Sequence, residues 1–334
     1  MYARGLQSLW EAQALDMATS ASLRSISCEK TCKDIHDKWG RVDQLARVLA
    51  CTTNMERRQI RETYKSMYGL DPTDHLQQTR DANANSEIGS LLSLWLLEPH
   101  ERDAVMAREA LNSSHTNYNA LLELYIGRKS SQLLLIKQEY HAKFKRQLDQ
   151  DISSEPDDSY QKILVALATS HKSHYTEVSQ HVAKCDAKRL HEAGEGRMGT
   201  IDENVVLEII SKRSIQQLKI TINTYKHIYG RDYRKSLKSK PGGEFEDALR
   251  MVVECLCNPV KYFSKMLNKN ISETTKDNPL PRVLISRAGI DIAEIGSYFK
   301  AKYGRKLEEA IEESVTNTDQ RDFLVALAAA NSTR

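Results

Sequence analysis

Glycine and proline are scarce in this chain of 334 residues, which contains 14 and 7 of them respectively. Together they are roughly half as frequent as in average proteins. Because hairpins depend on tight turns that these residues favour, an architecture of many short strands is excluded. The scarcity favours an all-helical chain.

Long apolar runs and a dominant charge are also missing. The longest uncharged apolar run, from Ile88 to Leu97, is half as long as the ~20 residues that cross a bilayer, so we expect no transmembrane segment. Lys and Arg number 48 against 45 Asp and Glu, a net charge of +3. So small a net charge gives no field that would attract nucleic acid, and we expect no nucleic-acid partner.

Signals for secretion are absent from the N-terminus, where Arg4, Glu11 and Asp16 interrupt any basic-then-apolar pattern. The six cysteines stand in a chain long enough to form a core without disulfides, so they resemble reduced thiols. We therefore expect a soluble, cytoplasmic protein.

One unit recurs four times along the chain, marked by two aromatic residues four positions apart. The pairs are Tyr64 with Tyr68, Tyr140 with Phe144, Tyr225 with Tyr229, and Phe299 with Tyr303. The residues that directly follow the pairs are Gly69, Lys145, Gly230 and Gly304. The residues twelve positions before each first aromatic are Thr52, Arg128, Arg213 and Arg287. Four diverged copies therefore account for most of the chain.

Each copy has the periodicity of helices. In the third copy Val205, Val206, Ile209 and Ile210 form an apolar stripe at helical spacing. Aromatic residues at positions i and i+4 share one helical face, and the following glycine suits a left-handed helix end. We expect the aromatic pairs to pack in the core and the glycines to end helices.

Several segments resemble the annexin family, most closely its plant branch, of which the chain looks like a diverged member. Cys28 to Gly40 (CEKTCKDIHDKWG) is similar to the opening of the plant first repeat, and Glu98 to Leu111 (EPHERDAVMAREAL) to the connection between repeats 1 and 2. Tyr140 to Leu148 resembles the second repeat, and Arg282 to Tyr303 resembles the fourth. Met17 also resembles a usual plant annexin start.

The resemblance implies an all-α fold of four annexin-like repeats, each of about five helices, in a curved disc. We expect an N-terminal extension over 1–23 and repeats over 24–97, 98–170, 191–262 and 263–334, with an inter-repeat connection over 171–190. The resemblance also implies peripheral binding to anionic phospholipid through Ca²⁺ held in the helix-joining loops.

The family's main calcium site combines a G-x-G-T loop with one bidentate acid from a later loop of the same repeat. Ca²⁺ takes six to eight oxygens, and glycine lets the loop turn several carbonyls inward. The second repeat keeps the acid, Glu155, without a glycine in its loop. The third keeps Met198, Gly199 and Thr200, with Glu203 beyond them, but has Lys240 at the acid position. The first repeat has Thr79 at the acid position, with Asp81 nearby, and a loop from Lys38 to Arg41 that is one residue short. The fourth repeat shows neither half.

No repeat retains both halves, so we expect Ca²⁺ binding that is weak or residual, at Met198, Gly199, Thr200, Glu203 and Glu155. A structural alternative for Thr200 and Glu203 is a capping box at a helix start, which we favour about two to one. Docking without calcium would use a cation at the acid position of the third repeat, Lys240.

A second candidate membrane contact is Lys38, Trp39, Gly40 and Arg41. An indole favours the lipid interface and the flanking cations favour anionic headgroups. A half-buried tryptophan at a loop explains the same residues equally well.

Other chemistry has weaker support. His171, His174, His181, Cys185 and His191 form a cluster in which a solvated connection is favoured over metal binding. A phosphate-binding G-x-x-x-x-G-K-[ST] loop is absent. We expect no enzyme. Two alternatives to membrane docking remain, a helical scaffold that binds protein partners and a redox or metal enzyme that uses the His/Cys cluster.

Overall fold

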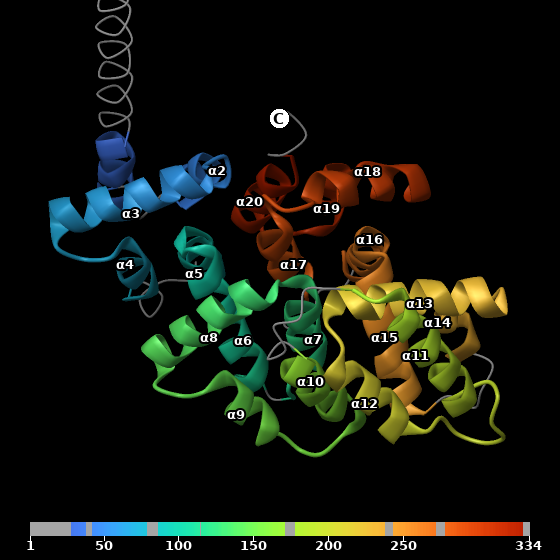
Figure 1. Cartoon of the computed structure of the whole chain (residues 1–334). Helices are drawn as coiled ribbons and strands as arrows, with labels where there is room; N and C mark the ends of the chain where they lie inside the picture. Colours follow the sequence, from blue (N-terminus) through green and yellow to red (C-terminus); the bar gives the residue numbers. More distant parts are fainter. Residues whose placement is uncertain are drawn as a thin grey trace, which may run out of the picture. The chain divides into compact units, whose positions relative to one another are not determined.

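The computed structural model describes residues 28–37, 42–78, 86–113, 115–170, 178–237, 243–271 and 278–329. Within these ranges the regular secondary structure is helical and contains no strand (Figure 1). The all-helical class predicted from the scarcity of glycine and proline is confirmed.

The chain divides into two compact units. The first comprises Met1–Glu98 with Asn270–Arg334, and the second Pro99–Lys269. The helices of the first repeat are residues 28–37, α2 (Val42–Ala50), α3 (Asn54–Tyr68), α4 (Pro72–Gln78) and α5 (Ser86–Leu96). Those of the last repeat are α16 (Pro259–Asn270), α17 (Leu280–Arg287), α18 (Ile292–Tyr303), α19 (Leu307–Ser314) and α20 (Thr318–Ala329). All but one residue of α16 belongs to the second unit.

The second unit holds the two middle repeats. The second repeat consists of α6 (Pro99–Asn112), α7 (Tyr118–Gly127), α8 (Ser130–Phe144), α9 (Leu148–Ser153) and α10 (Ser159–Ser170). The third consists of α11 (Gln180–Ala193), α12 (Glu203–Lys212), α13 (Ile215–Tyr229), α14 (Tyr233–Ser236) and α15 (Glu244–Cys257). Four sets of five helices therefore follow one another in the described residues.

The aromatic pairs lie on the third helix of each set and anchor it in the core. The first ring of each pair is fully buried, at Tyr64, Tyr140, Tyr225 and Phe299. The two rings of each pair lie 4.7 to 5.1 Å apart between centroids. The core role predicted for these residues is confirmed.

Each of these third helices ends on a residue in the left-handed conformation. The φ angles are 71° at Gly69, 67° at Gly230 and 76° at Gly304, as predicted for the glycines. Lys145 adopts the same conformation with φ of 56°, the one non-glycine residue with positive φ in the described part of the chain. The repeat therefore imposes this helix end even where the sequence has no glycine.

The arginine twelve residues before the aromatic pair fastens two helices together in the middle repeats. Arg128 Nε and Nη2 donate to Asp103 at 2.6 and 3.1 Å, and Arg213 makes the same pair of bonds to Asp186 at 2.6 and 3.1 Å. Both aspartates are buried on the first helix of their repeat. A bidentate pair of this kind fixes the orientation of the guanidinium relative to the buried carboxylate.

Helices of different repeats interlock within each unit. In the second unit α10 packs on α12, and α15 packs on α7. In the first unit α20 packs on α2. The last helix of one repeat therefore covers the second helix of another, and Leu164, Leu167, Leu324 and Leu327 are buried there.

The connection expected over 171–190 is helical from Gln180 onward. Ser179 caps α11 by accepting a hydrogen bond from the Val182 N–H at 3.3 Å. Ala183 and Ala187 are buried, and α11 packs on α13. Residues 171–177 lie outside the described part of the chain.

Candidate calcium and membrane-docking site

The loop of the third repeat joins α11 to α12 and carries three of the candidate calcium-binding residues. Met198 is 98% exposed, and Gly199 has φ of 90°. Thr200 is also exposed. The left-handed glycine turns the backbone at the tip of the loop, so the Met198 side chain points into solvent.

The base of this loop is built on His191. The His191 carbonyl accepts hydrogen bonds from Gly194 N–H at 3.1 Å and Gly196 N–H at 2.8 Å. A Cβ at Gly196 would lie 3.3 Å from His191 Cδ2 and 3.2 Å from its carbonyl oxygen. Glycine at 196 therefore allows the loop to lie directly against the imidazole, which also stacks on Tyr229 with the ring centroids 4.0 Å apart.

Glu203 is the first residue of α12, and the capping box expected from Thr200 and Glu203 is wrong. The N-cap is Asp202, whose side chain accepts from the Val205 N–H at 3.4 Å. Asp202 also pairs with Arg197 at 3.0 Å across the loop. The helix starts later than expected because the Asp202 N–H bonds back to the Ala193 carbonyl at 2.9 Å.

In the second repeat the structure places Glu155 beside the loop between α6 and α7. The Thr116 hydroxyl donates a hydrogen bond to Glu155 Oε2. Glu155 follows α9, and Asn117 caps α7 by accepting from the Ala120 N–H at 3.1 Å. The acid therefore lies against the loop of its own repeat, with one oxygen engaged by threonine.

Further carboxylates near this loop were missed in the sequence. Burial raises the pKa of the Tyr118 hydroxyl, and the negative charges of Asp158, Glu155 and Glu244 raise it further. Tyr118 follows the loop directly and stacks on Tyr160, with the two ring centroids 6.0 Å apart. Because Glu244 belongs to the third repeat, the spacing within the second repeat gave no signal for it.

The remaining candidate contacts cannot be placed. Lys38, Trp39, Gly40 and Arg41 lie outside the described residues, and so does Lys240. The structure therefore places Met198, Gly199 and Thr200 in one loop and Glu203 at the start of the helix that follows it, with Glu155 in a different repeat. Glu246, the acid six residues after Lys240, is buried and accepts a hydrogen bond from the Gly243 N–H at 3.0 Å.

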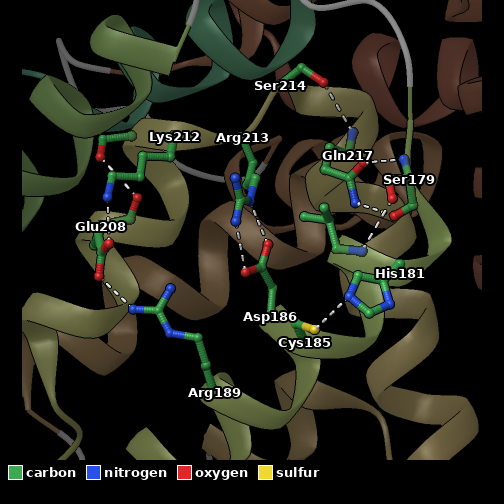
Figure 2. Close-up of polar contacts among 12 residues, drawn as sticks. Ser179, His181, Cys185, Asp186, Arg189, Glu208, Lys212, Arg213, Ser214 and Gln217 are labelled. Carbon is green, nitrogen blue, oxygen red and sulfur yellow. Dashed lines mark hydrogen bonds and ion pairs between the residues drawn. The ribbon is translucent and has the colours of Figure 1, made fainter.

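The His/Cys cluster separates in the structure. His191 faces the Tyr225 hydroxyl and the Tyr229 ring, whereas His181 and Cys185 lie together on α11 (Figure 2). Within the described residues no group of three or more His, Cys, Asp or Glu side chains is placed to hold a metal ion. His171 and His174 lie outside those residues.

Among the helices that the structure describes, none has the length and the apolar character that crossing a bilayer requires.

Comparison with known proteins decides the family. The annexin family model matches residues 102–167, 185–252 and 262–327, which is more than half of the chain. The chain belongs to the annexin family. Annexin A4 of Rattus norvegicus is 33% identical to it over 286 residues, covering 85% of this chain and 88% of the relative. Annexin A3 of Homo sapiens is 32% identical over 81% of this chain and 83% of the relative.

Solved structures agree with this assignment. A structure of annexin III has a TM-score of 0.77 and 29% identity, covering 91% of this annexin and 94% of that chain. A calcium-bound annexin (Sm)1 has a TM-score of 0.73 at 21% identity, which shows the fold alone. Annexins bind Ca²⁺ and attach peripherally to phospholipid membranes. The annexin relatives are generally not enzymes.

Proposed function

We propose that this annexin docks peripherally on anionic phospholipid surfaces with weak dependence on calcium. The observation that carries the proposal is the loop of the third repeat, which projects Met198 at 98% exposure from a glycine turn. An exposed apolar tip favours insertion among lipid headgroups. Backbone carbonyls at Met198, Gly199 and Thr200 and the carboxylate of Glu203 are the proposed calcium ligands.

Calcium binding is expected to be weak because each loop provides few oxygen ligands for the ion. Ca²⁺ prefers six to eight, with carboxylates that offset its charge. The third repeat has Lys240 where a bidentate acid would stand, and its Asp202 already pairs with Arg197. In the second repeat Glu155 is engaged by Thr116. Each of these loops therefore leaves an ion largely to water.

Local cations supply the attraction that calcium would otherwise mediate. Lys240 is the proposed contact of the third repeat, and Lys38 with Arg41, flanking Trp39 and Gly40, that of the first. Each basic group near an anionic surface contributes about 1 kcal/mol to membrane binding.

We also infer that the protein is cytoplasmic and that it belongs to the plant branch of the annexins. The inferred repeats span 24–97, 98–170, 191–262 and 263–334, with an N-terminal extension over 1–23 and an inter-repeat connection over 171–190.

Co-sedimentation with vesicles tests the proposal. Vesicles that contain phosphatidylserine should retain the protein both with calcium and with a chelator, and calcium should strengthen retention only modestly. Vesicles of phosphatidylcholine alone should not retain it. Retention that vanishes completely in chelator would contradict weak calcium dependence, and no retention under any condition would contradict membrane docking.

A helical scaffold for protein partners is the second candidate function. Leu134 and Leu135, adjacent on α8, are 58% and 42% exposed. Large apolar side chains that are exposed on a helix surface favour contact with another protein. Absence of vesicle binding in every condition above, with a folded protein, would favour this candidate.

A further inference from the structure

Two histidines and two tyrosines of the first repeat form one cluster of rings. His36, on the helix over 28–37, stacks on Tyr68 of α3 with the ring centroids 3.9 Å apart, and its Nδ1 lies 3.1 Å from the Tyr64 hydroxyl. The ring of His75, on α4, lies 5.7 Å from that of His36 at an interplanar angle of 25°. Three helices of the repeat therefore meet at a pair of imidazoles.

The second repeat has a cation and an acid at the same positions. Arg108, on the first helix of that repeat, donates to the Tyr140 hydroxyl at 3.3 Å and to the Asp151 carboxylate at 3.2 Å. Asp151 stands eleven residues after the first aromatic residue of its repeat, as His75 does in the first repeat. His36 thus corresponds to the cation, and His75 takes the place of the acid.

The third repeat has a histidine at the cation position and keeps an acid beside it. His191 Nδ1 lies 3.4 Å from the Tyr225 hydroxyl, and its ring stacks on Tyr229 with the centroids 4.0 Å apart. Glu195 Oε2 lies 3.7 Å from His191 Nδ1 and accepts a hydrogen bond from the Tyr225 hydroxyl at 2.8 Å. A charged His191 therefore meets a carboxylate, whereas a charged His36 meets a second imidazole.

The fold of the first repeat favours the neutral form of His75. This side chain is half-buried, and burial lowers its pKa, with the charge of His36 lowering it further. A histidine whose pKa is lowered by folding stabilises the fold above its unfolded pKa of about 6.5, and this contribution is lost as the pH falls through the folded value. Mild acid therefore acts against the packing of α4.

The acids on α4 and on the helix packed against it do not reverse this effect. Asp71, at the start of α4, pairs with Arg61 of α3 at 2.9 Å, and Asp74 is exposed. The α5 helix packs on α4 and carries one acid, Glu87, at its exposed first turn.

The other two helices of the cluster add one nearby acid. Burial raises the pKa of Cys32 to about 12, so this thiol is neutral. Burial also raises the pKa of Tyr68, and the charge of Asp37 raises it further, which places this exposed carboxylate near the Tyr68 hydroxyl. Glu62 and Lys65, on α3, are exposed. The net effect on His75 remains a lowered pKa.

We propose that the first repeat contains an acid-sensitive switch, in which neutral His36 and His75 pack together at pH 7 and repel one another when both are charged. Mild acid then loosens the helix over 28–37 and α4 from α3, and the buried side chains of Ile35 and Leu76 become accessible. The second and third repeats stay closed, because each has an acid beside the cation. The switch does not depend on membrane docking.

Coulomb repulsion gives a lower bound for the effect. Two unit charges at the 5.7 Å between the ring centroids change an equilibrium by about threefold even in bulk water at low salt. A half-buried pair is screened less than a pair in water. The first repeat should therefore open at least about threefold more readily when both imidazoles are charged.

Hydrogen exchange of the full chain at low salt, measured by mass spectrometry at pH 7 and pH 5 and corrected for the intrinsic exchange rates, tests the switch. From pH 7 to pH 5 the protection of α3 and α4 should fall at least about threefold more than that of α8 and α9 in the second repeat. His36→Gln and His75→Gln should each remove this excess, because one partner can no longer become charged. His227→Gln, at an exposed site on α13, should leave it unchanged.

His75→Asp provides a variant with the opposite expected response. It introduces the residue type of the second repeat, so that a charged His36 gains an acid as its partner. Because this partner stabilises the protonated imidazole, the protection of α3 and α4 relative to α8 and α9 should rise from pH 7 to pH 5. Equal losses of protection in the first and second repeats of the unaltered protein, or an excess that persists in both His36→Gln and His75→Gln, would overturn the proposal.

Discussion

Glu155 and Thr116 show how one hydroxyl group affects a candidate calcium site. Thr116 donates to the Glu155 carboxylate across the loop of the second repeat. An ion that approached Glu155 would have to replace this hydrogen bond. Hydrogen bonds to charged groups contribute about 1.5–3 kcal/mol, so we expect this competition to lower the affinity of the proposed calcium site in the second repeat.

Replacing this threonine by an isosteric side chain should strengthen calcium binding. Thr116→Val leaves Glu155 free of the hydroxyl, and we expect the affinity for Ca²⁺ to rise about tenfold, which corresponds to about 1.4 kcal/mol. Isothermal titration calorimetry measures the change. Ser113→Ala removes a hydroxyl that bonds to the Glu109 carbonyl instead and should have no effect. A lower affinity in Thr116→Val would mean that the hydroxyl assists the ion.

Asp151 of the second repeat is bonded to three side chains. Its carboxylate accepts hydrogen bonds from the Tyr140 hydroxyl at 2.6 Å, from Arg146 Nε at 2.8 Å and from Arg108 Nη1 at 3.2 Å. The bond to Arg146, with that to Tyr140, lowers the pKa of Asp151 below its usual value. The carboxylate is thus stabilised in its charged form by the fold.

Asp151→Asn should lower the free energy of unfolding by about 2 kcal/mol at pH 7, because it takes the charged partner away from the buried Tyr140 hydroxyl and from the partly exposed Arg108 and Arg146. Urea unfolding at pH 7 and pH 3 checks this. The contribution of Asp151 is complete above the unfolded pKa of about 3.9 and is lost as the pH falls through the lower folded value. The difference between the two proteins should therefore shrink at pH 3. An equal loss at both pH values would contradict this account, and Asp157→Asn, at an exposed site, is the control.

At the scale of elements, the left-handed end of the third helix is common to all four repeats. Gly230 and Lys145 occupy equivalent positions with φ of 67° and 56°. A Cβ at Gly230 would meet no atom within 4 Å, so a side chain there would be disfavoured by the backbone conformation alone. The left-handed region costs non-glycine residues roughly 1–2 kcal/mol.

Exchanging these residue types should have opposite effects. Gly230→Ala should destabilise the protein by about 1 kcal/mol, because alanine is strained in the left-handed conformation. Lys145→Gly should be neutral or should stabilise the protein by up to about 1 kcal/mol. Glycine relieves the strain at this position, but its greater flexibility in the unfolded chain offsets part of that gain. Thermal or urea unfolding measures both. Lys143→Gly, inside α8, should destabilise by about 1 kcal/mol and controls for the loss of lysine. Destabilisation by Lys145→Gly of the same size would show that the side chain, not the backbone, matters at 145.

The sequence predicted the elements where a repeated signal existed. The aromatic pairs and the glycines after them located the third helices because burial and left-handed φ restrict the residue type strongly. The start of α11 was missed because its buried face is made of alanines, Ala183 and Ala187, among many polar residues. A small apolar stripe gives a weak periodic signal.

The first repeat has a buried arginine at a position that the sequence did not single out. Thr52 stands where the other repeats have arginine, and Arg57 on α3 is buried instead, with its Cζ 3.8 Å above the Trp95 ring. Trp95 Nε1 donates to the Leu49 carbonyl at 2.8 Å. A charged residue in a helix reads as exposed, so only the three-dimensional contact reveals this arrangement.

At the scale of the whole molecule, the net charge of +3 gives no general attraction to an anionic surface. Docking must therefore depend on a few local groups. The candidate loops were found from the annexin repeat, but the partners of their residues were not, because Thr116 and Glu155 are 39 residues apart and meet only in the fold.

Lys240→Glu should separate the two modes of docking. In chelator, retention on phosphatidylserine vesicles should fall by at least about fivefold, because the loss of one basic group corresponds to about 1 kcal/mol and the new carboxylate adds repulsion. In calcium, the new carboxylate should restore a ligand and retention should rise. Raising the salt concentration should weaken the binding of the unaltered protein in chelator. Lys226→Glu, at an exposed site on α13, is the control, and an unchanged calcium response in Lys240→Glu would contradict the assignment.

The interlocking of α10 with α12 and of α15 with α7 has a consequence for how such a chain evolves. A single repeat cut from the second unit would leave the faces of its second and last helices bare, because a neighbour covers them. Loss of one copy therefore harms two. The smallest piece that natural selection can duplicate or delete without exposing a core is a pair of repeats, so the copy number of this architecture should change in steps of two.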